Sequence, residues 1–237
     1  MNSGEDKKTT LAWAAKALKE HLLFARLEGV EQLELLPSAP AGPSAVSFAP
    51  AVGGYSSLEE MRQQLTACCC CKLGATRKNL VFGEGNPQAE LVFVGEGPGA
   101  EEDAQGRPFV GRAGKLLDDI IKAMKLKREE VYICNVVKCR PPENRLPDTE
   151  EVAACLPYLL AQLEIIKPKI IVTLGALSTH TLLKTKEAMN KLRGRFHHYN
   201  QALLMPTYHP AYLLRNPPEK IKTWQDMQMV MKELGKN

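Results

Sequence analysis

Apolar residues follow two different spacings along residues 57–237 of the chain. Short apolar runs, typical of buried strands, occur in ELVFVGEG, VYICNVVK, PKIIVTLG and QALLMPTYH. Between and after them, apolar residues recur at helical spacing in GRAGKLLDDIIKAM, TEEVAACLPYLLAQLEII, ALSTHTLLK and PPEKIKTWQDMQMVMKEL. Ser57, followed by two acids, predicts the start of a further helix that runs into Cys68–Cys71. This alternation predicts an α/β fold, a three-layer α/β/α sandwich around a mostly parallel central sheet.

The N-terminal part of the chain has a different pattern. Residues 10–29 carry apolar side chains at helical spacing, and Gly29 is a plausible stop. Residues 36–56 are rich in Pro, Ala, Gly and Ser and have no core of their own. We therefore expect a helical extension over residues 1–35, used for docking or solubility, a linker over 36–56, and one domain over 57–237.

Composition narrows the class of protein. The 237 residues are 44% hydrophobic, and the net charge of +4 suits a polyanionic partner without establishing one. No apolar run is long enough for a membrane helix, and the start MNSGEDKKTT does not resemble a secretion signal. These features predict a cytoplasmic protein, in which the seven cysteines are reduced and serve metal binding, catalysis or burial rather than disulfides.

A glycine-rich loop, Gly95–Ala100, follows the first predicted strand and matches the dinucleotide pattern G-x-G-x-x-G/A. Pro98 and the three acids at 101–103 disfavour a pyrophosphate, and the next strand ends in Val137-Lys138 without an acid for a ribose. Such a loop can instead bring backbone N–H groups close to a ligand carbonyl. A nicotinamide oxidoreductase remains the less favoured interpretation.

Phe109 lies between turns in GRPFVG, downstream of the glycine loop. An aromatic side chain on a loop can stack on a nucleic-acid base, and filling the core is the alternative.

Four cysteines have the spacing of a metal site. Cys68 and Cys71 form a C-x-x-C pair, Cys139 follows a strand, and Cys155 lies on the next helix. Such a set can bind zinc or an iron–sulfur cluster, and the absence of a second C-x-x-C pair favours the cluster. Cys69 and Cys70 offer other pairings, and plain structural cysteines remain an alternative. Cys134, inside a strand, is interpreted as a small buried residue.

Taken together, the motifs resemble the family 4 uracil-DNA glycosylases, the iron–sulfur members of the uracil-DNA glycosylase superfamily. The resemblance rests on VGEGPGAEEDAQGRPFVGRAGKLL, NVVKCRPPENRLPD, the cysteine of EVAAC, PKIIVTLG, LRGR and TYHPAYLLR, whose order and spacing agree. It runs from about Cys68 to the C-terminal helix and leaves out residues 1 to about 55.

The resemblance implies a 4Fe–4S cluster and a uracil pocket. The ligands implied for the cluster are Cys68, Cys71, Cys139 and Cys155. The pocket residues implied are the Gly95, Glu96 and Gly97 backbone around the uracil O2, Phe109 stacked on the flipped base, Asn135 at the uracil edge, His209 stabilising charge on O2, Glu102 positioning water, and Asn144 in support. Ala100 and Gly97 replace the family's usual acid and alanine, so Glu96 and Asp103 rival Glu102 as the catalytic acid. The segment after Cys139 lacks the basic, histidine-bearing insertion of covalently trapping relatives.

The chemistry explains these residue types. A uracil in a duplex must be rotated out of the stack. The Asn135 amide can donate to O4 and accept from N3–H, a pattern that cytosine reverses. Donors aimed at O2 stabilise the departing uracil anion, and His209 with the backbone of 95–97 fits that role. No lysine lies in a nucleophile motif, so we expect a water nucleophile and an abasic product without strand cleavage.

Residues near the C-terminus are predicted to contact DNA. Leu213 and Leu214 follow the HPAY loop and can fill the gap left by the flipped nucleotide, with ordinary packing as the alternative. Arg193 and Arg195, in a basic stretch, and Arg215 can bind phosphates, with a solvated basic face as the alternative.

We therefore expect a monomeric, monofunctional uracil-DNA glycosylase acting on uracil in single- or double-stranded DNA, with no membrane partner. A sliding-clamp partner stays open. The alternative is a non-catalytic iron–sulfur or zinc module that binds nucleic acid.

Overall fold

The computed structural model describes residues 54–236. The predicted helix over residues 10–29 and most of the predicted linker lie outside the described residues.

A six-stranded sheet forms the centre of the described chain, in the order β1-β3-β2-β4-β6-β5. The four inner strands are parallel, and the edge strands β1 and β5 pair antiparallel with their neighbours. The strands are β1 (Glu84–Gly85), β2 (Leu91–Gly95), β3 (Tyr132–Asn135), β4 (Ile170–Leu174), β5 (His197–Tyr199) and β6 (Ala202–Thr207). Every residue of β2, β3 and β4 is buried, as expected for parallel strands covered on both faces.

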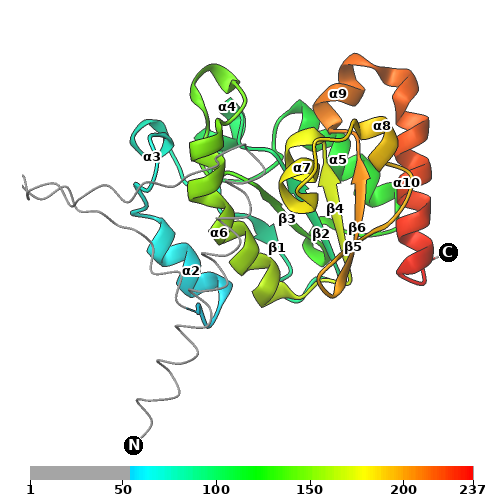
Figure 1. Cartoon of the computed structure of the whole chain (residues 1–237), viewed down its shortest axis with the longest axis horizontal. Coiled ribbons are helices and arrows are strands. Elements are labelled where there is room, and N and C mark those ends of the chain that lie inside the picture. Colours follow the sequence, from blue (N-terminus) through cyan, green and yellow to red (C-terminus); the bar gives the residue numbers. More distant parts are fainter. Residues whose placement is uncertain (1–53, 237) are drawn as a thin grey trace, which may run out of the picture.

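Helices cover both faces of this sheet (Figure 1). They are α2 (Leu58–Leu65), α3 (Leu73–Thr76), α4 (Ala100–Gln105), α5 (Arg112–Ala123), α6 (Thr149–Ile166), α7 (Ala176–Leu183), α8 (Met189–Leu192), α9 (Pro210–Arg215) and α10 (Lys220–Glu233). Three short 3-10 helices complete the elements: η1 (Arg128–Glu130), η2 (Pro142–Asn144) and η3 (Pro217–Glu219).

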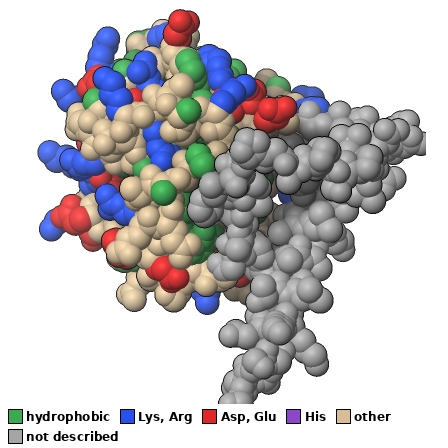
Figure 2. Space-filling model, turned by 90° about the vertical axis from the view of Figure 1, so that its left-hand side faces the viewer, with side chains coloured by type: hydrophobic (Ala, Val, Ile, Leu, Met, Phe, Trp, Pro, Cys, Tyr) green, Lys and Arg blue, Asp and Glu red, His purple; other side chains and the backbone are tan. Residues whose placement is uncertain are grey.

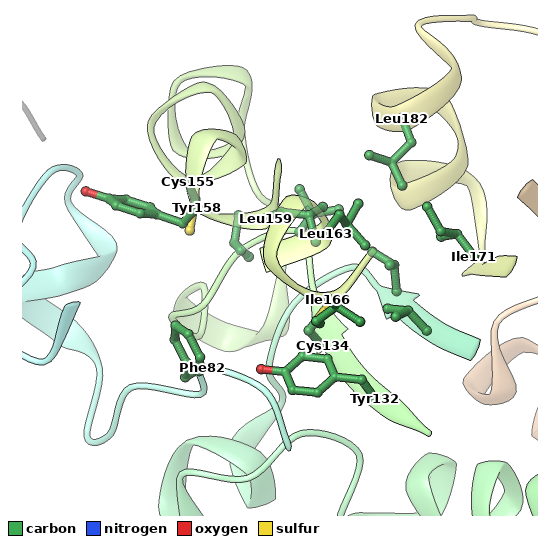
Figure 3. Close-up of a cluster of buried hydrophobic side chains, with 14 of the residues drawn as sticks. Phe82, Tyr132, Cys134, Cys155, Tyr158, Leu159, Leu163, Ile166, Ile171 and Leu182 are labelled. Carbon is green, nitrogen blue, oxygen red and sulfur yellow. The ribbon is translucent and has the colours of Figure 1, made fainter. Parts of the chain in front are cut away.

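Alternation along the strands divides the core into two clusters. On one face, Val92 and Val94 of β2 pack with α2, α6 and α7; Figure 3 shows this cluster around Leu159 and Leu163 of α6. On the other face, Leu91 and Phe93 pack with α5 and α10. The described chain thus forms the predicted three-layer α/β/α sandwich, with antiparallel strands at the two edges of its sheet.

Some local expectations were wrong. The helix that begins after Ser57 ends at Leu65 and does not reach Cys68–Cys71, because the chain turns there and the Cys68 N–H bonds the Leu65 carbonyl at 3.0 Å. The acids after the glycine loop, for which no element was predicted, form the helix α4, with Gly99 at its N-cap. The HPAY segment, expected to be a loop, begins the short helix α9 at Pro210.

No helix among residues 54–236 is long and apolar enough to cross a membrane.

Candidate active site and cysteine site

The carboxyl ends of the parallel strands meet at one edge of the sheet, at the top of Figure 1. The predicted pocket residues follow three of these strand ends. Gly95 ends β2, Asn135 ends β3, and His209 comes two residues after β6. Loops at the carboxyl ends of parallel strands are where α/β folds bind ligands.

Gly95 and Asn135 are direct partners in the β2–β3 register. A Cβ atom on Gly95 would stand 2.3 Å from Asn135 Oδ1 and 2.6 Å from Phe109 Cζ, distances that no real Cβ tolerates. Only glycine at position 95 therefore lets the amide and the aromatic ring converge over the strand end.

The Asn135 side chain has an unusual environment. It is 1% exposed, and its Oδ1 has no hydrogen-bond partner among the described residues. Buried acceptors are nearly always satisfied, and leaving one unpaired costs about 1–3 kcal/mol. An unpaired acceptor at a strand end, between a glycine and an aromatic ring, indicates a ligand donor at that point.

Phe109 is held in place by strained backbone. Its φ of 52° is left-handed, and it is 6% exposed. Gly114 in α5 makes this possible, because a Cβ there would stand 2.0 Å from the Phe109 carbonyl oxygen. The ring lies 5.6 Å from the His209 ring between centroids, at 32°. Phe109 belongs to the α5-side core cluster, so it fills the core and also forms a wall of the pocket.

His209 is neutral and has a defined tautomer. Its Nδ1 accepts the Ala211 backbone N–H at 3.1 Å, which leaves the ring hydrogen on Nε2. Burial, with a smaller effect from Arg215, lowers the pKa of His209 from 6.5 to about 4, while Glu102 acts in the opposite direction. The ring therefore offers an uncharged N–H donor at neutral pH.

Glu102 accepts hydrogen bonds from three backbone N–H groups. Its Oε1 accepts from Val110 and Gly111, both at 3.0 Å, and its Oε2 accepts from Gly99 at 3.1 Å. The carboxylate ties the N-terminus of α4 to the loop that carries Phe109. The arrangement supports a loop-holding role for Glu102 rather than the expected water-positioning role.

The two rival acids, Asp103 and Glu96, differ in whether their carboxylates are hydrogen-bonded within the fold. Asp103 is 2% exposed, and its Oδ1 accepts from the Lys78 and Asn79 backbone at 2.9 and 3.3 Å, so it serves the fold. Glu96 is partly buried, and no hydrogen bond to its carboxylate is recorded among the described residues. Burial raises the pKa of Glu96.

Asn144 lies apart from the other pocket residues. It is exposed, and its Oδ1 accepts from Arg140 Nε at 2.8 Å. Among the described residues no hydrogen bond joins it to Gly95, Asn135 or His209, and its expected supporting role stays a prediction.

The predicted cysteines converge from three segments on one cavity. Cys68 and Cys71 come from the turn after α2, Cys139 from the segment after β3, and Cys155 from α6. In the protein alone the cavity is small, with a volume of about 10 Å³. Cys70 also lines it and is hydrogen-bonded to the Tyr158 hydroxyl at 3.4 Å, whereas Cys69 is exposed and does not line it.

One side-chain donor and one backbone donor reach these sulfur atoms. Arg77 Nη1 donates to Cys139 Sγ at 3.1 Å, and the Lys138 backbone N–H donates to Cys155 Sγ at 3.3 Å. Burial raises the pKa of Cys139, against the effect of Arg77, and that of Cys155 to about 12. The protein alone therefore favours thiols at these positions, and thiolate ligands would need the charge of a bound metal.

Lys138 and Gln162 were missed from the sequence. Lys138 is fully buried; its Nζ donates to the Asn135 carbonyl oxygen at 2.7 Å and to Gln162 Oε1 at 2.5 Å. Gln162 is anchored in turn by the Phe82 carbonyl at 2.9 Å. One buried residue thus contacts both the strand end at Asn135 and, through its backbone, the cysteine cavity. The signal in the sequence was a lysine inside the run NVVKC, where a strand gives way to Cys139.

The expected DNA-contacting residues separate into two groups. Leu213 is 1% exposed and packs in the fold, and Arg193 forms an ion pair with the fully buried Asp226 at 2.6 Å. Burial favours the packing alternative for Leu213, and the ion pair engages Arg193 within the fold, while DNA contact by either residue stays untested. Leu214 is 36% exposed, and Arg195 and Arg215 are exposed and available to a partner.

Comparison with known proteins gives the family. Residues 82–228 match the family model described as the uracil DNA glycosylase superfamily. The chain is 46% identical over 188 residues to a type-4 uracil-DNA glycosylase of Saccharolobus solfataricus, covering 76% of this chain and 87% of that protein. The chain belongs to the uracil-DNA glycosylase superfamily. A type-4 enzyme of Thermotoga maritima is 48% identical over 167 residues (70% and 87% covered), and one of Sulfurisphaera tokodaii is 49% identical over 170 residues (68% and 77% covered).

This uracil-DNA glycosylase match covers all the pocket positions, from Gly95 to His209, together with Cys139 and Cys155. Cys68 and Cys71 precede the matched residues. Membership in the superfamily leaves the dinucleotide interpretation of Gly95–Ala100 without support.

Proposed function

We propose that this protein hydrolyses the N-glycosidic bond of uracil in DNA, releasing free uracil and leaving an abasic site. The names of the type-4 relatives support the reaction. The observation that carries the assignment to this site is the buried, unpaired Asn135 Oδ1 between Gly95 and Phe109. A uracil N3–H would satisfy that acceptor, whereas cytosine presents an acceptor at N3 and would leave it unpaired.

The remaining pocket residues fit the other parts of the base. Phe109 forms a wall on which the ring of a flipped base can stack. The His209 Nε2–H is an uncharged donor, fixed by the Ala211 N–H and suited to the negative charge that develops on O2 as the bond breaks. The close approach allowed at Gly95 lets the backbone of residues 95–97 line the same side of the base.

We assign the water-positioning role to Glu96. Glu96 alone among the three candidate acids has no recorded hydrogen bond committing its carboxylate to the fold. Its raised pKa makes it a better proton acceptor than an exposed glutamate. Glu102 instead holds the loops around the pocket and its charge acts on His209.

Two matched substitutions distinguish these roles. Glu96→Gln should lower kcat by about 10²-fold with an unchanged melting temperature, because it removes the proton acceptor and no structural bond. Glu102→Gln should lower the free energy of unfolding by about 1–3 kcal/mol, because the amide –NH₂ cannot accept from Gly99. Steady-state kinetics and urea denaturation measure the two effects. A wild-type kcat in Glu96→Gln would contradict the assignment of Glu96 and favour Glu102 as the residue that positions the water.

We further propose that the cysteine cavity holds a 4Fe–4S cluster with Cys68, Cys71, Cys139 and Cys155 as ligands. The four side chains come from three segments of the chain and line one cavity. Four cysteines are the usual ligand set of a 4Fe–4S cluster, and the chain has one C-x-x-C pair rather than the two that are usual in zinc ribbons. When bound, the cluster supplies the cross-link between the turn after α2, the segment after β3 and α6.

Removal of one ligand tests this site. Cys139→Ser should lose the visible absorption at about 400 nm and lower the melting temperature, since three segments lose their common anchor. The exposed Cys69→Ser is the matched control and should change neither quantity. Equal absorption in both variants would contradict the ligand set.

The proposed DNA surface consists of the exposed residues Leu214, Arg215 and Arg195. In this proposal Leu214 enters the gap left by the flipped nucleotide and the two arginines bind phosphates, which their exposure supports.

An oligonucleotide with one uracil tests the reaction itself. After incubation, alkali should cleave the strand at the uracil position in single- and double-stranded substrates, and no cleavage should occur before alkali. An intact strand after alkali would refute the proposed function, and cleavage without alkali would refute its monofunctional character.

A further inference from the structure

Leu146 is a large apolar side chain that the fold leaves in solvent. It is 65% exposed and lies in the segment between η2 and α6. Exposure of a single leucine is ordinary for a surface. The way in which this leucine is held is not.

The backbone at Leu146 is fixed by an anchored arginine. Arg145 Nη1 donates to the Leu146 carbonyl at 2.8 Å. The same guanidinium forms two hydrogen bonds with Glu151, at 2.8 and 2.6 Å, and that carboxylate is 1% exposed. Asp148, the N-cap of α6, forms a reciprocal capping pair with Glu151: its Oδ1 accepts the Glu151 backbone N–H, and its own backbone N–H donates to Glu151 Oε2, both at 2.9 Å. Leu146 therefore extends from a rigid support.

This support stands beside the uracil pocket. Pro141 and Pro147, on either side of the segment, each lie 3.9 Å from the position of a Cβ on Gly97. The neighbour of Leu146 is thus in near contact with the glycine loop. Figure 1 shows the segment before α6 and the helix α9 at the same end of the sheet, on opposite sides of the strand ends.

The segment offers an apolar contact and little charge for phosphates. Arg145 is committed to Glu151, and Lys72 at the neighbouring surface pairs with Asp148 at 2.5 Å. Glu143 and Glu150 are exposed on either side of Leu146. Figure 2 shows the face on the left of Figure 1, where the visible Lys and Arg side chains are interspersed with Asp and Glu.

We propose that Leu146 inserts against the base stack of double-stranded DNA beside the flipped uridine, opposite the side contacted by Leu214. A flipped nucleotide leaves its neighbours unstacked, and an apolar side chain held rigidly at the pocket rim covers the exposed base faces. Two leucines from opposite sides then hold the duplex open. The inference rests on the proposed function and adds to it a side chain that is needed for duplex substrates and not for single strands.

The test compares duplex and single-stranded substrates. Leu146→Ala should lower kcat/KM on a uracil-containing duplex by on the order of tenfold, with single-strand kcat/KM unchanged, because a single strand has no partnered stack to hold open. Leu146→Phe should keep the duplex activity. Met229→Ala, at a 38% exposed apolar residue far along α10, is the matched control and should equal the wild type on both substrates. The duplex defect should be the same at low and high salt, because the contact is apolar.

Two direct readouts complete the experiment. A 2-aminopurine placed next to the uridine should fluoresce less on binding of Leu146→Ala than on binding of wild type, since fewer complexes are unstacked. Melting temperatures should match, given the exposure of the side chain. Equal losses on both substrates, or no loss on duplex, would overturn the role of Leu146. If wild-type protein releases no uracil from either substrate, the proposed function itself fails, which is a separate outcome.

Discussion

Asn135→Ala is expected to lower kcat/KM for uracil release by on the order of 10³-fold. Removing the amide removes the group that the uracil edge would bond, and hydrogen-bonding sites discriminate by large factors because unpaired polar groups are costly. The substitution also deletes a buried acceptor that has no partner in the free protein. The free protein should therefore become more stable, not less, while activity is lost.

Opposite signs for activity and stability make this result diagnostic. Uracil-release kinetics and thermal denaturation on the same sample measure both. Asn86→Ala is the control, since Asn86 lies before the amino end of β2 and its amide caps the Gln88 N–H at 2.9 Å. It should lose a little stability and no activity. Full activity in Asn135→Ala would remove this residue from the site.

His209→Ala is expected to lower kcat by about 10²–10³-fold with a nearly unchanged KM, because one preorganised donor to a developing oxyanion is lost. The effect belongs to the transition state, in which O2 carries charge, more than to the bound substrate. His198→Ala, at an exposed position of β5, is the control and should retain activity. A raised KM with an unchanged kcat would show that His209 contributes to substrate binding and not to the chemical step.

The pH dependence follows from the lowered pKa of His209. With a pKa of about 4, the ring stays neutral through the physiological range, so its titration should leave the rate unchanged from pH 8 to about 5. In the unfolded chain the ring gains a proton near pH 6.5, while the folded protein does so near 4. Between these values the unfolded state binds more protons, so stability should fall as pH falls, and less steeply in His209→Ala.

Much of the fold was predictable because its inner strands are continuous runs of apolar residues. Parallel strands buried on both faces, such as LVFV and IIVTL, leave little ambiguity. The edge strands β1 and β5 were not predicted, since they are two and three residues long and only partly buried. The end of α2 was placed too late, because the helix stops where the cysteines must turn around a cavity, a constraint that helical spacing does not carry.

The candidate site was predictable where residue type and position coincide, as at Asn135, Phe109 and His209. The partners of each residue could not be read in the same way. Glu102 and Glu96 are both acids near one loop, and only geometry shows that the first is occupied by three backbone N–H groups. Arg193 looks like a phosphate ligand until Asp226, thirty-three residues later in the chain, is placed beside it.

The unpaired oxygen of Asn135 also bears on the end of the reaction. Its partner belongs to the base, and the base keeps that N–H after the bond to the sugar is broken. Free uracil therefore meets the same acceptor as the nucleotide did, and it gives the protein back a hydrogen bond that the empty pocket lacks. If Asn135 binds the uracil edge as proposed, we expect free uracil to compete with substrate for the same acceptor and to act as a product inhibitor.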